Sequence, residues 1–218
     1  MSDAARQQHW ENVYATKGEQ EVSWFEQNPS LSLALIKEAG FGSEAVVIDI
    51  GGGASHLVDA LLTDSQARIT VLDLSANALE VARARLSKSA VRVNWVVSDV
   101  TAWKPDRAYD VWHDRAAFHF LTEAADQSAY VAVLRAALKP GGVAIIGTFA
   151  LDGPEKCSGL PVARHDEHSL ANILGADFEL LSSQRHEHQT PWAAVQRFQF
   201  SSFRRLQRAW SSPYGLRQ

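Results

Sequence analysis

The sequence VVIDIGGGAS occupies residues 46–55 and joins a continuous apolar run to three consecutive glycines. Short apolar runs rich in Val and Ile are typical of strands that are buried on both faces of a parallel sheet. Glycine has no Cβ, so a glycine turn after such a strand lets a ligand approach the backbone closely. A helix predicted at residues 56–63 follows the turn, and its N-terminus favours a negative group such as a carboxylate.

Two common phosphate-binding motifs do not fit this turn. The dinucleotide fingerprint, counted from Gly51, requires glycine at position 56, where this chain has His56. A P-loop requires Gly-Lys-Ser/Thr after the first glycines, and no such residues follow. The turn is therefore predicted either to receive another kind of ligand or to be no more than a tight turn.

Apolar runs and helical patterns alternate along most of the chain. Further strands are expected at residues 68–74, 91–97, 109–114, 143–150, 178–188 and 194–203, and further helices at 3–15, 29–39, 76–86, 122–139 and 169–174. This alternation predicts an α/β fold with parallel strands, right-handed crossovers and helices on both faces of the sheet. The last two strands should form a hairpin around Thr190-Pro191 that adds one antiparallel strand, and residues 151–168 should be a long polar loop.

The chain is predicted to form one compact domain. Its 218 residues, with 46% hydrophobic and 21% charged residues, have an ordinary globular composition. Residues 1–44 are expected to be a helical N-terminal lid segment over one end of the sheet, and residues 45–218 to hold the sheet itself.

Charge and composition argue against several classes of partner. The net charge of −4 is unlike that of a dedicated nucleic-acid binder, which is usually basic. The sequence has no run of 18 apolar residues and no apolar core of a signal peptide, so no membrane partner is expected. The single cysteine, Cys157, rules out a disulfide within the chain and favours a reducing compartment. The expected location is the cytoplasm.

Acidic residues stand where three predicted strands end. Asp49 precedes the glycine turn, Asp73 closes the second strand and Asp99 follows the third. A carboxylate in the place of Asp73 commonly accepts from two ribose hydroxyls, although it can also share the capping of the next helix with Ser75. Asp99, beside the backbone of Val100, can accept from an exocyclic adenine amine. The carboxyl ends of such strands border the ligand crevice of open α/β sheets, so these groups are predicted to share one site.

Five segments carry a family resemblance: VVIDIGGGAS (46–55), VLDLS (71–75), SDV (98–100), YDVWHD (109–114) and LKPGGVAIIG (138–147). In this order they resemble the successive motifs of class I S-adenosylmethionine-dependent methyltransferases, and the resemblance covers residues 45–200. It implies a doubly wound, seven-stranded, mostly parallel sheet with strand order 3-2-1-4-5-7-6 and helices on both faces. It also implies S-adenosylmethionine as the cofactor.

The resemblance assigns places along the cofactor. Gly51 and Gly53 lie beside its methionine part, Asp73 on its ribose and Asp99 on its adenine. Ser55 stands where the family often has a third glycine and is small enough to fit there. Together with their neighbours and the N-terminal aromatic residues, the predicted cofactor-binding residues are Trp10, Tyr14, Trp24, Asp49, Gly51, Gly53, Ser55, Asp73, Leu74, Asp99, Val100 and His113.

The physical demands of methyl transfer agree with this interpretation. The cofactor's sulfonium is a cation, which an acidic crevice with aromatic neighbours attracts. The methyl group is already activated, so the main tasks of the protein are to align the nucleophile and to exclude water. Residues 1–27 are rich in aromatic side chains and are the expected lid.

Two features bear on the acceptor. The segment 110–121 and the N-terminal aromatics are similar to a subgroup that includes protein lysine methyltransferases, whose fourth strand commonly ends in Asp-Lys-Gly-Thr; only Asp114 of those four is present here. The chain has no large insertion or separate substrate domain. We therefore expect methyl transfer to a nucleophilic N, O or S atom of a small molecule. The alternatives are a protein (lysine-type) methyltransferase and a non-catalytic cofactor-binding regulatory module.

Histidines concentrate near the predicted carboxyl edge of the sheet, at positions 113, 119, 165, 168, 186 and 188. Asp114, His119 and His186 are the candidate catalytic residues, as groups that orient the acceptor or act as general base. One alternative is that most of these histidines are only hydrogen-bonded or solvent-exposed. Another is a metal site made of His165, His168, His186, His188 and Cys157, but their spacings match no standard zinc pattern and no metal is predicted.

Overall fold

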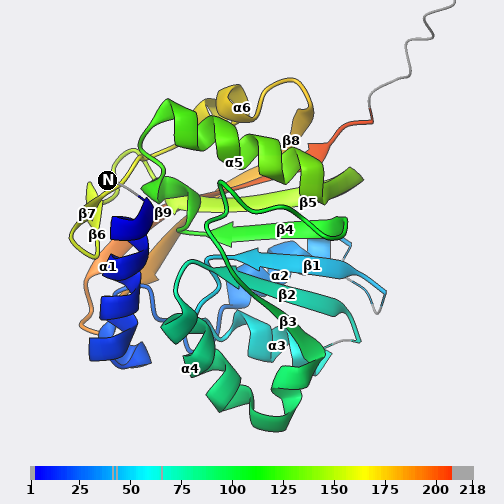
Figure 1. The fold of residues 1–218 in the computed structure, drawn as a ribbon. Coiled ribbons are helices and arrows are strands. Elements are labelled where there is room, and N and C mark those ends of the chain that lie inside the picture. The colour runs from blue at the N-terminus through cyan, green and yellow to red at the C-terminus, as the bar shows by residue number, and fades with distance from the viewer. Residues whose placement is uncertain (1–2, 41, 43, 65, 208–218) are drawn as a thin grey trace, which may run out of the picture.

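The computed structural model describes residues 3–40, 42, 44–64 and 66–207. Within them, seven strands form one sheet in the order β3-β2-β1-β4-β5-β9-β8 (Figure 1). The first five strands are parallel, and β9 runs antiparallel to both β5 and β8. This confirms the predicted order 3-2-1-4-5-7-6. The strands are β1 Val46–Ile50, β2 Arg68–Asp73, β3 Val93–Val97, β4 Tyr109–Arg115, β5 Leu138–Phe149, β8 Phe178–Gln189 and β9 Val195–Arg205.

Two hydrophobic cores lie on opposite faces of this sheet. In β1 all five residues are buried, and Val47 packs into one core while Ile48 packs into the other, because successive side chains of a strand point to opposite faces. Helices α2, α3 and α4 contribute to the first core, and α5 and α6 to the second. The helices are α1 Asp3–Thr16, α2 Ser30–Glu38, α3 Leu57–Asp64, α4 Ala76–Leu86, α5 Ala124–Ala137 and α6 Glu167–Leu174, with single 3₁₀ turns η1 Glu19–Glu21, η2 Ser87–Arg92 and η3 Phe118–Phe120.

The prediction of a long polar loop at 151–168 is wrong. A small hairpin of β6 (Lys156–Cys157) and β7 (Leu160–Pro161) interrupts it, and α6 begins within it. Ser158 and Gly159 make the connection with φ angles of 51° and 78°, as a two-residue hairpin turn with positive φ at both positions requires. The hairpin buries Cys157 beside the carboxyl edge of the sheet.

Helix α1 lies across the end of the sheet to which the parallel strands point (Figure 1). Glu11 fastens it to the N-terminus of α4: its carboxylate accepts hydrogen bonds from Ser75 Oγ at 2.8 Å, Ala76 N at 2.8 Å and Asn77 N at 3.0 Å. Burial raises the pKa of Glu11, but these hydrogen bonds outweigh it and hold the pKa below its usual value. The N-terminal helix thus supplies an anionic cap to a helix of the sheet domain.

No helix in the described part of the chain is both long and apolar enough to cross a membrane.

We predict that Glu11→Ala lowers the free energy of unfolding by about 1–2 kcal/mol, because it leaves backbone amides of α4 without their cap while alanine preserves α1. Urea denaturation of wild type and variant measures the difference. The matched control is Glu80→Ala on α4, whose side chain is 70% exposed and whose removal should change stability by less than about 0.5 kcal/mol. Equal losses in the two variants would contradict the capping role.

Candidate functional site

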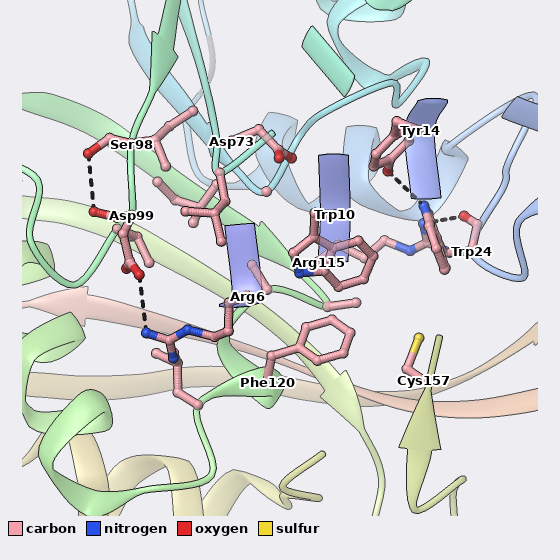
Figure 2. Close-up of a pocket in the computed structure, with 18 residues that line it drawn as sticks. Arg6, Trp10, Tyr14, Trp24, Asp73, Ser98, Asp99, Arg115, Phe120 and Cys157 are labelled. Carbon is pink, nitrogen blue, oxygen red and sulfur yellow. Dashed lines mark hydrogen bonds and ion pairs between the residues drawn. The ribbon is translucent and has the colours of Figure 1, made fainter. Parts of the chain in front are cut away.

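A pocket opens where the carboxyl ends of β1, β2, β3 and β4 meet under α1 (Figure 2). Its space, counted out to solvent, is about 830 Å³, within the range typical of small-molecule sites. A second pocket of about 590 Å³ adjoins it and shares Tyr14, Trp24, Gly51 and Arg115 with it.

The sequence-predicted cofactor residues divide between these pockets. All of them except Gly53 line one or both. The larger pocket contains Trp10, Tyr14, Trp24, Gly51, Asp73, Leu74, Asp99 and Val100. The second contains Asp49, Ser55 and His113 in addition to the shared residues.

The glycine turn after β1 is closely packed on both sides. A Cβ on Gly51 would lie 2.8 Å from the Cβ of Ala117, and one on Gly53 would lie 2.8 Å from a carboxylate oxygen of Asp73. Both glycines also have positive φ, 66° and 38°. Side chains are therefore excluded at these positions by space and by backbone conformation. The turn leaves its backbone exposed along the floor that joins the two pockets.

Asp73 ends β2 with a buried carboxyl group. One oxygen accepts a hydrogen bond from Ser75 N at 2.8 Å, while the Ser75 hydroxyl caps α4 by accepting from Ala78 N at 3.1 Å. The other oxygen lies beside Gly53. Burial, with the charges of Asp49 and Glu11 nearby, raises the pKa of Asp73 to about 7. Asp73 thus supports the helix cap through Ser75, and its ionisation at the pocket wall costs free energy because the carboxyl group is buried.

Asp99 is held between the sheet and α1. One of its oxygens accepts from the backbone and hydroxyl of Thr101 at 2.8 and 2.7 Å. The other pairs with Arg6 at 3.1 Å, and Arg6 also pairs with Asp126 at 2.9 Å. Sequence reasoning missed Arg6, since nothing in its neighbourhood indicates a contact with a residue 93 positions away.

Aromatic rings from α1, from the segment that follows it and from η3 form one wall of the larger pocket. Trp10 meets Trp24 and Phe120 edge-on, with ring centroids 5.6 and 5.0 Å apart, and Trp24 Nε1 donates to the Tyr14 hydroxyl at 3.2 Å. Burial and the nearby Asp73 raise the pKa of Tyr14, so its hydroxyl stays protonated. These contacts fix the orientation of the rings (Figure 2).

His113 and Asp49 form a buried pair at the base of the second pocket. His113 Nδ1 lies 2.7 Å from Asp49 Oδ1, and its Nε2 lies 2.9 Å from Ser32 Oγ. The carboxylate can only accept, so Nδ1 carries the proton toward Asp49. These hydrogen bonds join α2, β4 and β1 beneath the glycine turn.

Asp114, a candidate catalytic residue, lies near the end of β4. Its side chain is fully buried outside both pocket linings. Its oxygens accept from Tyr130 Oη at 2.7 Å, Ala117 N at 2.9 Å and Phe118 N at 3.1 Å. Burial raises its pKa to about 6 despite these bonds. Asp114 is a structural group that holds the turn after β4.

His119 and His186 also lie away from the pocket linings. His119 is fully buried, its Nδ1 lies 3.4 Å from Phe149 N, and burial lowers its pKa to about 3. His186 lies on β8 with 33% of its side chain exposed, 3.9 Å from Glu26. Neither side chain is among the residues that line the two pockets, so a role for them as general base stays a prediction. Among the described residues, the His, Cys, Asp and Glu side chains form no group of three or more that could hold a metal ion.

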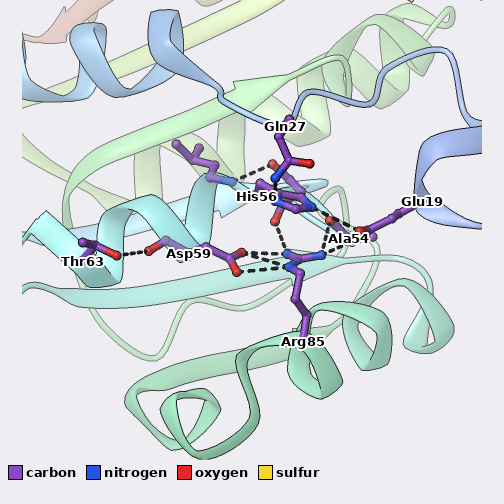
Figure 3. A network of polar contacts seen from close by, with 9 residues as sticks. Glu19, Gln27, Ala54, His56, Asp59, Thr63 and Arg85 are labelled. Atoms are coloured by element: carbon purple, nitrogen blue, oxygen red, sulfur yellow. Dashed lines mark hydrogen bonds and ion pairs between the residues drawn. The ribbon is translucent and has the colours of Figure 1, made fainter. Parts of the chain in front are cut away.

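Arg85 on α4 is a supporting residue that the sequence did not reveal (Figure 3). It donates to the carbonyl oxygens of Ala54 and Ser55 at 3.0 and 2.8 Å, and so braces the end of the glycine turn. It also pairs with Asp59 on α3 and Glu19 in η1, each at 2.7 Å. A planar guanidinium with five donors can hold all these groups at once.

Comparisons with known proteins agree with the architecture. Residues 47–142 match a family model described as a methyltransferase domain, which confirms the resemblance drawn from the sequence motifs. Nodulation protein S of Rhizobium tropici is 28% identical over 124 residues, 57% of this chain and 51% of that protein. Malonyl-[acyl-carrier protein] O-methyltransferase of Halalkalibacterium halodurans is 35% identical over 111 residues, 49% of this chain and 40% of that protein. The chain spans about half or less of the length of these curated relatives.

A solved structure shows the same fold at low sequence identity. The 1,6-didemethyltoxoflavin-N1-methyltransferase of Burkholderia thailandensis, crystallised with 1,6-didemethyltoxoflavin and S-adenosylhomocysteine, superposes with a TM-score of 0.68. The match covers 94% of this chain and 85% of that one at 22% identity. At this identity the likeness concerns the fold.

We predict that Asp73→Asn stabilises the ligand-free protein increasingly as the pH rises. The folded pKa of Asp73 is about 7, well above that of an unfolded Asp, about 3.9. Between pH values of about 3.9 and 7, Asp73 ionises readily in the unfolded state but stays protonated in the folded state. The free energy of unfolding of the wild type therefore falls as the pH rises, whereas that of Asp73→Asn lacks this loss because the amide does not ionise. Asn also retains the acceptor for Ser75 N.

Urea denaturation at about pH 5 and about pH 8 measures this effect, and the advantage of Asp73→Asn should grow by about 2–4 kcal/mol over that interval. Asp106→Asn, on a carboxylate that is 59% exposed, is the control and should show no such growth. A pH-independent difference between wild type and Asp73→Asn would contradict the assignment.

Proposed function

We propose that the protein transfers a methyl group from S-adenosylmethionine to a nucleophilic N, O or S atom of a small molecule. The match of residues 47–142 to a model described as a methyltransferase domain, within a sheet of the class I strand order, supports this proposal. The observation that carries the proposal is the convergence of the glycine turn, Asp73, Asp99 and the N-terminal aromatic wall on two joined pockets.

The residues present fit this cofactor. Gly51 carries no side chain of its own and lines both pockets, at the place proposed for the methionine part. Asp73 is proposed to accept from both ribose hydroxyls. Asp99 and Val100 are proposed to receive the adenine; a carboxylate oxygen can accept more than one hydrogen bond, so the contacts of Asp99 with Thr101 and Arg6 leave room for another.

When bound, S-adenosylmethionine supplies an activated methyl group on a sulfonium cation. The residues of the protein orient the reacting groups, shield them from water and attract the cation. Trp10, Trp24 and Phe120 offer aromatic rings whose faces suit a cation and whose bulk excludes water. We further propose that α1 and the segment up to Glu26 serve as the lid over residues 45–218, since Glu11 and Arg6 hold α1 across the strand ends.

The acceptor is proposed to enter beside Arg115 and Cys157, at the end of the larger pocket that lies away from Asp99 (Figure 2). No histidine stands among the described residues that line this pocket. Burial raises the pKa of the Cys157 thiol to about 11, so it stays protonated. The lining therefore favours acceptors that present their nucleophile without a protein histidine as base.

Two similar proteins support the coarse reaction class. One is named for O-methylation of a malonyl group on an acyl carrier protein, and the other for N1-methylation of a small heterocycle. For location we propose the cytoplasm, because the chain has a single, unpaired cysteine, as is usual in reducing compartments.

We predict that the protein binds S-adenosylhomocysteine and that Asp73→Ala weakens this binding about 5- to 150-fold, because it removes one or two hydrogen bonds to a charged group. Hydroxyl donation favours the charged carboxylate, so binding near neutral pH should release a proton from wild type and not from Asp73→Asn. Isothermal titration in buffers of different ionisation enthalpy measures affinity and proton release together.

Asp106→Ala is the matched control and should bind like wild type. Tighter binding of a nicotinamide dinucleotide than of S-adenosylhomocysteine would overturn the cofactor assignment. Label transfer from methyl-labelled S-adenosylmethionine onto a metabolite extract, compared with a protein extract, tests the acceptor class. Label in protein alone would favour the protein methyltransferase, and label in neither would favour a binding module.

A further inference from the structure

Glu26 is the centre of a buried ionic cluster that joins the N-terminal segment to two strands of the sheet. Its Oε1 lies 3.0 Å from Arg115 Nη2 at the end of β4 and 3.2 Å from His188 Nδ1 on β8. His186 Nε2 lies farther away, at 3.9 Å. The side chains of Glu26, Arg115 and His188 are 19%, 13% and 3% exposed, so solvent screens their charges weakly.

His188 contacts the N-terminal segment through both of its ring nitrogens. Its Nε2 lies 2.7 Å from the carbonyl oxygen of Ser23, which can only accept, so Nε2 donates to it. Its Nδ1 faces the Glu26 carboxylate at 3.2 Å. Burial raises the pKa of Glu26, but the His188 hydrogen bond and the Arg115 charge outweigh it and hold the pKa below its usual value.

Arg115 and His188 hold three places in one short segment, Ser23–Glu26, which we call the strap. His188 holds the Ser23 carbonyl, Arg115 Nη1 donates to the Trp24 carbonyl at 3.0 Å, and both side chains meet Glu26. Between these anchors, the Trp24 ring lines both pockets. The position of that ring therefore depends on a backbone that is fastened on either side of it.

We infer that Glu26 and His188 are positioning residues: through their contact at hydrogen-bond distance they fasten the strap to the sheet and keep the Trp24 ring in the wall of the cofactor pocket. The inference deepens the proposed function and rests on it for the identity of the ligand. Neither residue acts on the methyl group itself. Of the motif His186-x-His188, only His188 takes this part.

Hydrogen exchange of the strap, corrected for intrinsic rates, tests the anchoring without ligand. Peptides that cover residues 22–27 should exchange about tenfold faster in His188→Gln and Glu26→Gln than in wild type, which corresponds to the loss of one charge-assisted hydrogen bond. His168→Gln replaces a histidine that is 82% exposed and should exchange like wild type. Equal exchange in all four proteins would overturn the anchoring.

Affinity for S-adenosylhomocysteine at one fixed pH connects the strap to the pocket. His168→Gln should bind like wild type, whereas His188→Gln and Glu26→Gln should each bind about tenfold more weakly. Faster exchange with unchanged affinity would refute the link to Trp24. Failure of wild type to bind the ligand at all would instead refute the proposed function.

Discussion

The close approach of the turn after β1 to the end of β2 is the constraint on which the site depends. Only glycine tolerates it, because a Cβ on Gly53 would stand 2.8 Å from an Asp73 oxygen and one on Gly51 equally close to Ala117. The approach buries the Asp73 carboxyl group and raises its pKa to about 7. The folded protein therefore carries an energetic cost at this edge, which a ligand with hydroxyl donors would relieve.

The N-terminal segment supplies the part of the pocket wall that the sheet does not form. Glu11, Arg6 and the strap fasten it to α4, β3, β4 and β8, and each contact joins residues far apart in sequence. Trp10, Tyr14 and Trp24 then close the open side of the crevice. Because the fastenings are mostly ionic, the wall depends on protonation states as well as on packing.

Local patterns predicted the sheet and part of the pocket lining. Parallel strands place their carboxyl ends together, so the positions of Asp73 and Asp99 after apolar runs were enough to bring them to one edge. The orientation of the residues after β4 was not predictable in this way. Ala116 has a φ of 67°, and there the chain turns so that Ala116 and Ala117 face the pocket while Asp114 accepts hydrogen bonds beneath it. His119 follows the same turn into the core. The contacts of Arg85 and His188 depend on tertiary packing and have no local signal.

The most direct test of this account is a crystal structure of the protein grown with S-adenosylhomocysteine. The account predicts the two ribose hydroxyls within hydrogen-bond distance of the Asp73 carboxylate, and the amino-acid end of the ligand against the Gly51 backbone. A ligand bound elsewhere, or one whose ribose points away from Asp73, would contradict it.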